Sequence, residues 1–415
     1  MIFGIKTIDD FDVKGKTVLL RCDLNQPVDK ETDTLKDTTR IQASVPTIRE
    51  FADKGAKVVV MAHQGSDIEY KNFWTTRPHA KVLTELLGRE VKFIEDVCGP
   101  EAQKAIRSLK DGEILLLDNV RFVSEEQTLF EKKLKLTPQE QADTLVVRKL
   151  APLADLYVCD AFAAAHRAQP TLCGFEYVLP SAMGRLFEKE YDVISGIMAE
   201  PERPCVFVLG GAKIGDAFQM MDSVLSRGIA NHVLTGGLAG NIMLAAQGKA
   251  IGAGSMAFIE KSNNAEYIET AKELNAKYGD KIMVPADVAY VAEGARKEAK
   301  IGEVPEEITA LDIGKETIAA YQKTIREAKT VFVNGPMGVF EEDLTEAGTK
   351  AVWEALADTP AFTVVGGGDS ITATKKYKKQ DDISYICTGG GSLIRFLSGE
   401  ELPVVAALRY AAEEK

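Results

Sequence analysis

The chain has 415 residues, 45% of them apolar, and a formal net charge of −12. This length exceeds what one ordinary hydrophobic core holds, so we expect two domains. The acidic balance argues against a nucleic-acid-binding surface, which needs an excess of basic residues. The sequence shows neither the roughly 18 consecutive apolar residues of a membrane span nor the apolar core of a signal peptide near its start. We therefore expect a cytoplasmic protein with no nucleic-acid or membrane partner.

The six cysteines are scattered, at positions 22, 98, 159, 173, 205 and 387. None forms a C-x-x-C pair, so the sequence suggests neither a zinc cluster nor a thioredoxin-like redox site. Cysteine is among the most frequently buried residue types, and disulfides are rare in the cytosol. We expect reduced and mostly buried thiols.

Short β-branched or apolar runs recur along the chain, each followed by a glycine-rich or polar turn and a helical stretch. In the first half these runs are Thr17–Arg21, Lys57–Ala62, Val91–Ile94, Glu113–Leu117 and Asp155–Cys159. In the second half they are Cys205–Leu209, His232–Thr235, Lys281–Val284, Thr330–Val333, Phe362–Val365 and Ile383–Cys387. Uninterrupted apolar strands that alternate with helices indicate parallel sheets covered on both faces. The pattern predicts an α/β protein with two Rossmann-like domains, each a parallel sheet flanked by helices.

A domain boundary is predicted near the middle of the chain. Pro180 and Gly184 precede the helical stretch Arg185–Ala199, and the sequence EPERP at Glu200–Pro204 ends it. We expect a first domain over residues 1–180, a connecting helix over 185–200 and a second domain over 201–399. One helix between two α/β units would make a semi-rigid connector, so we expect the domains to face each other across a hinged cleft.

The loops that follow the strands of the first half are rich in groups that bind anions. In parallel sheets, ligands bind at the carboxyl ends of the strands. An arginine or histidine at such a position is, taken alone, more often a surface ion pair or a structural group. Several cations on one rim of an acidic protein repel one another unless an anion compensates them, and arginine suits bidentate phosphate or carboxylate contacts. The residues concerned are Arg21, Asp23, Asn25, Arg40, His63, Ser66, Arg121 and Arg167.

The second half carries glycine-rich turns instead, in VLGGAK, LTGGLAGN, VNGPMGVFE, VVGGGDS and CTGGGS. Glycine lets a backbone approach phosphates closely, and the helix that follows points its amide groups at negative charge. Asp369 is the natural ligand for Mg²⁺ among these residues. We expect Ser370 to cap the next helix, Lys213 to oppose phosphate charge and Glu341 to contact a ribose.

Two other nucleotide-binding patterns are excluded or weak. The sequence contains no G-x-x-x-x-G-K-[ST], which excludes a P-loop enzyme. The segment Gly252–Ala257 matches the dinucleotide pattern G-x-G-x-x-A, but it follows what reads as the end of a helix. A dinucleotide fingerprint should follow a strand, so a nicotinamide dehydrogenase stays a minor alternative.

The ordered series VLLRCDLNQP, AHQG, DNVRF, CDAFAAAHRA, VLGGAK, LTGG, LDIG, VNGPMGVFE, GGGDS and TGGGS resembles the phosphoglycerate kinase family along nearly the whole chain, and most closely its archaeal members. The resemblance implies reversible phosphoryl transfer between 1,3-bisphosphoglycerate with ADP and 3-phosphoglycerate with ATP, in glycolysis and gluconeogenesis. It implies Mg²⁺ bound with the nucleotide, direct transfer to a carboxylate and hinge-bending domain closure. It also implies that residues 400–415 pack back onto the first domain.

Carried onto this sequence, the resemblance implies three sets of site residues. Substrate would be bound by Arg21, Asp23, Leu24, Asn25, Arg40, His63, Gln64, Gly65, Ser66, Arg121 and Arg167. The nucleotide would be bound by Lys213, Gly236, Gly237, Leu238, Asn334, Glu341, Gly366, Gly367, Gly368, Asp369 and Ser370, with Asp369 on the metal. The transferring group would be stabilised by Arg40, Lys213, Gly368 and Gly391.

The sequence departs from the family pattern at two positions. Ser66 stands where an arginine is common, and we take Arg77 as a candidate replacement. Ala217 stands where many members have a second lysine. A catalytically silent homologue that senses a metabolite or nucleotide is the alternative function, and a monomer is favoured over a homodimer.

Overall fold

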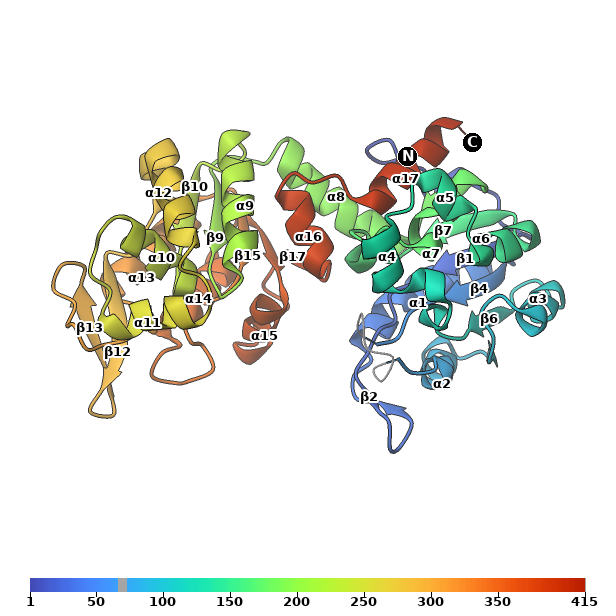
Figure 1. Ribbon diagram of the computed structural model, residues 1–415, viewed down its shortest axis with the longest axis horizontal. Helices are drawn as coiled ribbons and strands as arrows, with labels where there is room; N and C mark the ends of the chain where they lie inside the picture. Colours follow the sequence, from blue (N-terminus) through green and yellow to red (C-terminus); the bar gives the residue numbers. More distant parts are fainter. Residues whose placement is uncertain (66–72, 415) are drawn as a thin grey trace. The chain divides into compact units, whose positions relative to one another are not determined.

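The computed structural model describes residues 1–65 and 73–414, so Ser66 lies outside the described residues. The chain divides into two compact units, shown in Figure 1. The first unit comprises Met1–Val193 and Glu401–Lys415, and the second comprises Ile194–Glu400.

The first unit is built on a parallel sheet with the spatial order β5-β6-β4-β1-β7-β8 among the described residues. The strands are Thr17–Arg21 (β1), Lys57–Met61 (β4), Val91–Ile94 (β5), Ile114–Leu117 (β6), Leu156–Cys159 (β7) and Ser181–Met183 (β8). All but β8 were predicted to within one residue at each end. β8 was not predicted, because a strand of three residues after a proline is too short to show a pattern of apolar residues. A small antiparallel hairpin, β2 (Val28–Asp29) with β3 (Thr34–Leu35), follows β1.

Helices surround this sheet and bury its apolar side chains. They are Thr39–Asp53 (α1), Arg77–Leu87 (α2), Pro100–Arg107 (α3), Thr128–Leu134 (α4), Pro138–Ala142 (α5), Leu145–Leu150 (α6), Pro170–Cys173 (α7) and Pro403–Glu414 (α17). α1 and α2 pack against each other, and α17 packs against β8 and α7 although it comes from the end of the chain. One core cluster runs from Ile8 through the strand residues Leu20 and Val60 to Phe51 of α1.

The second unit is built on a parallel sheet with the order β11-β10-β9-β15-β16-β17 within the described part of the chain. The strands are Cys205–Leu209 (β9), His232–Thr235 (β10), Ile282–Met283 (β11), Thr330–Asn334 (β15), Phe362–Gly366 (β16) and Tyr385–Cys387 (β17). Every one lies inside or within one residue of a predicted run. β9, which is fully buried, and β15, which is buried except at its last residue, form the centre of the sheet, as uninterrupted apolar strands do in parallel sheets.

The helices of the second unit form two packed groups. α9 packs with α10, α12 and α16, and α13 packs with α14, which also contacts α15. Their bounds, with that of α11, are Ile214–Ser226 (α9), Gly237–Ala246 (α10), Ala253–Lys261 (α11), Tyr267–Tyr278 (α12), Lys315–Glu327 (α13), Ala347–Asp358 (α14), Gly368–Lys376 (α15) and Gly390–Leu397 (α16).

A second, antiparallel sheet of the second unit was not predicted. It joins Asp287–Ala292 (β12), Ala295–Lys300 (β13) and Asp312–Ile313 (β14). β13 is largely exposed, and its sequence ARKEAK has no apolar period. β12 and β13 pair directly through a turn at Glu293 and Gly294, both with positive φ, and sequence period alone gives no sign of such a surface hairpin.

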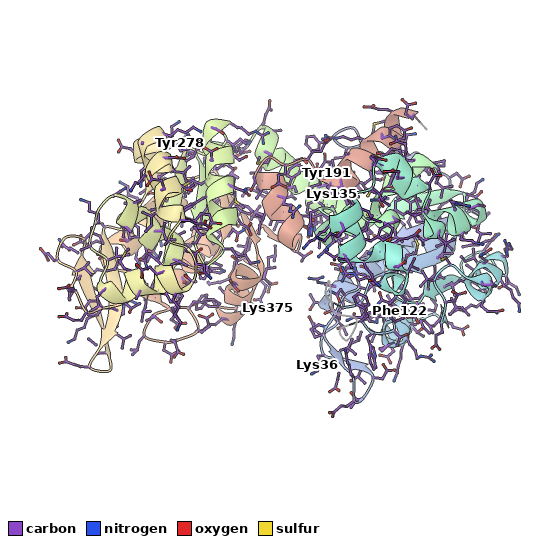
Figure 2. The ribbon with its side chains drawn as sticks, in the orientation of Figure 1. Lys36, Phe122, Lys135, Tyr191, Tyr278 and Lys375 are labelled. Carbon is purple, nitrogen blue, oxygen red and sulfur yellow. The ribbon has the colours of Figure 1, made fainter. Side chains whose placement is uncertain are left out.

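Helix α8 (Arg185–Ala199) begins in the first unit and ends in the second, with the bounds that the sequence predicted. Its start is fixed by two backbone N–H groups, of Leu186 and Phe187, which donate to Asp160 Oδ1 at 2.8 and 3.2 Å. Arg185 donates to the carboxylates of Asp9, Glu50 and Glu188. Further along, Tyr191 of α8, labelled in Figure 2, accepts a hydrogen bond of 2.8 Å from Arg409 of α17.

The cysteines are free and buried throughout the described chain, as expected. Within the same residues, none of the helices combines the length and the apolarity that crossing a bilayer requires.

Candidate active site

In the first unit, the expected anion-binding residues follow β1, β4, β6 and β7, at the carboxyl edge of the sheet. β1 lies between β4 and β7 in this sheet, so the loops after these strands leave the sheet side by side. Asp23 and Arg40 meet there: Arg40 donates to Asp23 Oδ2 at 2.7 Å. The Asp23 side chain is 7% exposed and that of Arg40 is 46% exposed. The buried carboxylate therefore holds a guanidinium whose other face remains open to a ligand.

The loop after β4 is tied to its neighbours by a hydrogen-bond network. Asn25 Oδ1 accepts from the Gly65 amide at 2.9 Å, and Arg121 donates to the Gly65 carbonyl. Asn119 fixes the same loop, accepting from the Gln64 amide at 3.0 Å and donating to the Gln64 carbonyl at 2.7 Å. The network gives a fixed orientation to the side chains that we assign to substrate.

His63 lies where the cations converge. It is 7% exposed, and burial followed by the positive charges of Arg121, Arg21, Arg167 and Arg40 holds its pKa well below the ordinary value. The imidazole is therefore neutral at physiological pH. Four arginines from separate segments act on this one ring: Arg21 ends β1, Arg40 lies in the first turn of α1, and Arg121 and Arg167 follow β6 and β7. The structure therefore brings together the cationic rim that the sequence predicted.

Like Arg40 and Arg121, the other two arginines are held by protein partners. Arg21 is fully buried and donates to Thr171 Oγ1 at 3.0 Å, with His63 Nδ1 at 3.2 Å. Arg167 donates to Thr128 Oγ1 at 3.2 Å and lies 3.6 Å from Glu131. Arg21 is thus buried beneath the cationic rim, where it orients His63. Its position at the end of a strand did not indicate this burial.

The candidate replacement for the arginine expected at residue 66 is held in an ion pair of its own. Arg77 is paired with Glu95 at 2.5 Å, and its guanidinium lies 5.2 Å from the ring centroid of Phe93 on β5. β5 is the edge strand of the sheet, with β6 and β4 between it and β1. Arg77 therefore belongs to an exposed ion pair beside β5, and its contact with substrate stays a prediction.

In the second unit, the strand order places β9 beside β15 at the point where the chain reverses its direction of winding. Ligands bind at such switch points, outside the carboxyl ends of the strands. The loops there touch backbone to backbone: the Gly210 amide donates to the Asn334 carbonyl and the Gly237 amide to the Met337 carbonyl. A Cβ on Gly210 would lie 2.0 Å from the Pro336 oxygen. These turns need glycine for close approach to each other.

A pocket of ≈ 260 Å³ opens beside these loops. It brings together four expected nucleotide-binding residues from different segments: Gly237, Leu238, Glu341 and Asp369. Figure 1 shows the helices that border it, with α10, α11 and α15 drawn around the sheet. An apolar pocket with a few polar groups suits a small organic ligand.

The other expected residues of this half divide into exposed and structural positions. Lys213 is exposed at the start of α9, and Gly368, the first residue of α15, has open space where a side chain would be. Ser370 is fully buried and accepts from the Gly335 amide at 2.7 Å, and Gly367 rather than Ser370 is the N-cap. The predicted cap is therefore wrong, and Ser370 instead fixes the loop after β15.

Two more expected glycines are set by packing, and a third lies at the start of a helix. A Cβ on Gly366 would lie 2.2 Å from Leu393, so this glycine makes room for a core side chain. Gly367 has a φ of +91° and lies against the Asn334 side chain. Gly391 is the second residue of α16, where its amide belongs to the first turn of the helix.

The sequence interpretation missed several residues that line the pocket. They include Asn241 of α10, Ser255 and Phe258 of α11, and the segment 309–311 before β14. The segment Gly252–Ala257 does not follow a strand, as expected, but it does place Ser255 at the pocket. A Cβ on Gly254 would lie 2.1 Å from Thr309 Oγ1. The sequence did carry a sign of this contact. Two glycines at the start of a helix, with no expected role in phosphate binding, indicate that the helix packs tightly against a neighbouring segment.

Comparisons with known proteins agree with this arrangement. The family model "Phosphoglycerate kinase" matches residues 8–400. The phosphoglycerate kinase of Methanothermobacter thermautotrophicus is 46% identical over 98% of this chain and 97% of its own length. The crystal structure of phosphoglycerate kinase from Pyrococcus horikoshii OT3 has a TM-score of 0.87 and 38% identity, over 99% of this chain and 100% of its own. That from Coxiella burnetii has a TM-score of 0.83 and 28% identity, over 97% and 98%. The chain therefore belongs to the phosphoglycerate kinase family, whose members are phosphotransferases with a carboxyl group as acceptor.

Proposed function

We propose that this chain transfers a phosphoryl group reversibly between 1,3-bisphosphoglycerate with ADP and 3-phosphoglycerate with ATP, with the glycerate on the first unit and the nucleotide on the second. The observation that carries the proposal is the set of four arginines around His63, a concentration of positive charge that an anionic substrate would compensate. The comparisons give no support to the alternative of a catalytically silent sensor.

In the first unit, Arg40, Asn25, Asp23 and His63 are the residues that we assign to direct substrate contact. Arg40 has the exposed guanidinium, and its pairing with Asp23 fixes where that group points. A neutral His63 can donate one hydrogen bond without adding to the charge. Arg121 and Arg167 supply further positive charge, while Arg21 acts through His63.

In the second unit, Lys213 and the amides at the starts of α15 and α16 are assigned to the phosphates. The acceptor is a carboxylate, which is anionic at neutral pH, so no general base is needed. The remaining difficulty is electrostatic, because two anions must meet and charge must be stabilised on the transferring group. Arg40, Lys213, Gly368 and Gly391 are assigned to that role, and removing one such donor costs about 3 kcal/mol of transition-state stabilisation.

Mg²⁺ is the metal that we propose to accompany the nucleotide. Asp369 is an exposed carboxylate at the pocket, and among the described residues there is no group of three or more His, Cys, Asp or Glu that could hold a metal. A single carboxylate fits Mg²⁺, which is usually bound by one or two carboxylates together with phosphates and water. When bound, the ion would neutralise charge on the phosphates.

We further propose that the protein works as a monomer in the cytoplasm, without nucleic-acid or membrane partners. The free, buried cysteines fit a reducing compartment.

A coupled assay with 3-phosphoglycerate and Mg-ATP tests the proposal. We expect a turnover number on the order of 10 s⁻¹, within the range of about 1–100 s⁻¹ that is usual for kinases. Asp369→Ala should weaken the Mg-ADP complex and leave 3-phosphoglycerate binding intact in calorimetry. No turnover with any nucleotide would refute the proposed activity, and an unchanged Mg²⁺ titration in the variant would refute the metal role of Asp369.

A further inference from the structure

A buried chain of hydrogen bonds leads away from His63 into the first unit. Arg21 Nε donates to Thr171 Oγ1 at 3.0 Å, and the Thr171 hydroxyl donates to Glu126 Oε2 at 2.9 Å. The Thr171 backbone amide donates to the other carboxylate oxygen of Glu126 at 2.5 Å. Arg21, Thr171 and Glu126 are all fully buried. Neither Glu126 nor Thr171 was predicted as a site residue.

The direction of each bond in this chain follows from what the groups can donate and accept. A guanidinium only donates and an ionised carboxylate only accepts, so the Thr171 hydroxyl accepts from Arg21 and donates to Glu126. Burial raises the pKa of Glu126 to about 7, while Arg21 and the two bonds from Thr171 lower it, so the carboxylate is ionised above that pH. A buried guanidinium requires a compensating charge, and Glu126 supplies it through one hydroxyl group.

The guanidinium of Arg21 is held at all three of its nitrogens. Nε donates to Thr171, one terminal nitrogen donates to the Cys22 carbonyl at 2.5 Å, and the other lies 3.2 Å from His63 Nδ1. Thr171 is itself fixed, because the Tyr157 hydroxyl donates to its carbonyl at 2.8 Å. A guanidinium is planar and presents its donors in a rigid fork, so these partners leave Arg21 one orientation.

The contact with Arg21 determines which nitrogen of His63 carries the hydrogen. Arg21 cannot accept a hydrogen bond, so Nδ1 must accept, and the neutral ring carries its hydrogen on Nε2. Among residues 1–65 and 73–414, His63 Nε2 has no hydrogen-bond partner. The ring therefore offers a ligand a donor. The other tautomer would offer a lone pair, which repels the oxygen of a carboxylate or phosphate.

We propose that Glu126 and Thr171 are positioning residues for substrate: they hold Arg21 so that His63 keeps its hydrogen on Nε2 and donates it to the anionic glycerate. This inference rests on the proposed function, since it takes the glycerate to bind at His63. Glu126 and Thr171 act only through Arg21, and their effect is on the hydrogen-bonding state of the ring.

Nitrogen-15 NMR of the histidine rings tests the proposal, because protonated and unprotonated ring nitrogens give separate signals. The chain has four histidines, and His63→Gln identifies the signals of His63. At about pH 8, above the pKa of Glu126, we expect the wild-type ring to carry its hydrogen on Nε2. Thr171→Val removes the hydroxyl and keeps the backbone bonds of this residue, so it should give a mixture of both tautomers. Thr171→Ser restores the hydroxyl and should restore the wild-type signals.

Calorimetry with 3-phosphoglycerate provides the second measurement. Thr171→Val and Glu126→Gln should each weaken its binding about tenfold, the effect of one lost hydrogen bond to a charged group. The affinity for Mg-ADP should be unchanged in both variants, and Thr171→Ser should bind 3-phosphoglycerate as the wild type does.

The matched control is Thr76→Val. Thr76 is also fully buried in the first unit, and its hydroxyl donates to the Leu117 carbonyl at 2.8 Å. This variant loses a buried hydroxyl of the same kind, but it should keep the wild-type tautomer of His63 and the wild-type affinity for 3-phosphoglycerate.

If Glu126 and Thr171 only stabilise the fold, Thr171→Val will lower the melting temperature while the tautomer and the affinity stay those of the wild type, and the proposal is wrong. A wild-type spectrum with the hydrogen on Nδ1 would overturn it even if no variant folds. Either result, with normal turnover on 3-phosphoglycerate and Mg-ATP, leaves the proposed kinase activity standing. Absence of turnover by the wild type would instead contradict the proposed function.

Discussion

Arg40 and Asp23 form an ion pair in which a buried carboxylate holds the cation to which we assign a catalytic role. The carboxylate is almost fully buried, and the guanidinium is roughly half exposed. The ion pair therefore restricts the conformations of the Arg40 side chain before substrate binds. Less conformational entropy is then lost when the guanidinium contacts the transferring group. The role is electrostatic, so its removal should appear in turnover rather than in nucleotide affinity.

We expect Arg40→Ala to lower kcat at least about 100-fold and to leave the affinity for Mg-ADP nearly unchanged. Steady-state kinetics and calorimetry measure the two quantities. Arg77→Ala is the matched control in the same unit, because Arg77 is exposed and paired with Glu95, which follows the edge strand β5; its kcat should stay within about twofold of wild type. Loss of nucleotide binding with normal turnover in Arg40→Ala would contradict the assignment.

At the residue scale, the sequence predicted which side chains gather at the candidate site better than it predicted the hydrogen-bond partners of each side chain. The cations at strand ends were predicted because parallel strands bring their carboxyl ends to one edge. That Arg21 is buried beneath His63 and that Ser370 holds the Gly335 amide depend on partners about 150 and 35 positions away in the chain. Such partners are fixed by the tertiary fold, and residue type and spacing do not indicate them.

At the scale of elements, the turn between β9 and α9 depends on glycine at position 210. A Cβ there would lie 2.0 Å from the Pro336 oxygen, a backbone atom that cannot move without shifting the loop after β15. We expect Gly210→Ala to weaken ADP binding at least tenfold and to destabilise the protein by roughly 1–3 kcal/mol through this clash. Calorimetry and thermal unfolding measure the two effects.

Gly196→Ala is the control for that prediction. Gly196 lies inside α8, has ordinary helical backbone and meets nothing within 4 Å at its Cβ position. Alanine there should stabilise the helix by about 1 kcal/mol, because glycine is a poor helix former, and should leave ADP affinity unchanged. If Gly210→Ala bound ADP normally, the contact between the two loops would have no part in the nucleotide site.

The start of α8 depends on Asp160, and this dependence carries a pH signature. Burial raises the pKa of Asp160 to about 7 from the ordinary value of 3.8, against the lowering effect of its hydrogen bonds. Between roughly pH 4 and pH 7 the folded protein thus holds a proton that the unfolded chain has released, and wild-type stability falls as pH rises through this window. Asparagine keeps an oxygen for the two backbone amides but does not titrate.

We therefore expect the melting temperature of Asp160→Asn, relative to wild type, to rise between pH 5 and pH 7.5. The corresponding difference in stability should be at most about 3 kcal/mol, since each unit of pKa shift corresponds to about 1.4 kcal/mol. Scanning calorimetry at the two pH values provides the measurement. Parallel curves for the two proteins would show that Asp160 is ionised in the folded state throughout.

Strands with a clear apolar run were predicted well. Strands that form only because a neighbouring strand offers hydrogen-bond partners were missed. The apolar runs of β9 and β15 identify buried strands by themselves. β13 has no such run, and β8 has three residues that pair because β7 lies beside them. Likewise the pocket wall at Asn241 and Ser255 exists because two helices meet the Ala310 peptide, a juxtaposition that neither helix indicates alone.

At the scale of the whole molecule, the assigned chemistry requires the two units to bring their substrates together during the reaction. The residues that we assign to the glycerate belong to the first unit, and those that we assign to the nucleotide belong to the second. Direct in-line transfer requires the reacting atoms to come within about 3–3.5 Å of each other and requires water to be excluded. We infer that the units close on each other only when both substrates are present, with α8 as the element that accommodates the movement, because α8 is the helix that passes from one unit into the other.

Small-angle scattering provides the measurement. The radius of gyration should fall in the presence of 3-phosphoglycerate and a non-hydrolysable Mg-ATP analogue together, and should stay at the apo value with either ligand alone. Asp369→Ala is the matched control: with weakened Mg-nucleotide binding, it should not contract at ligand concentrations that saturate the wild type. Contraction with 3-phosphoglycerate alone would mean that the first unit triggers closure by itself, and equal radii in all states would contradict closure. Closure that needs both ligands would also protect the acyl phosphate from water, since no closed site forms around one substrate.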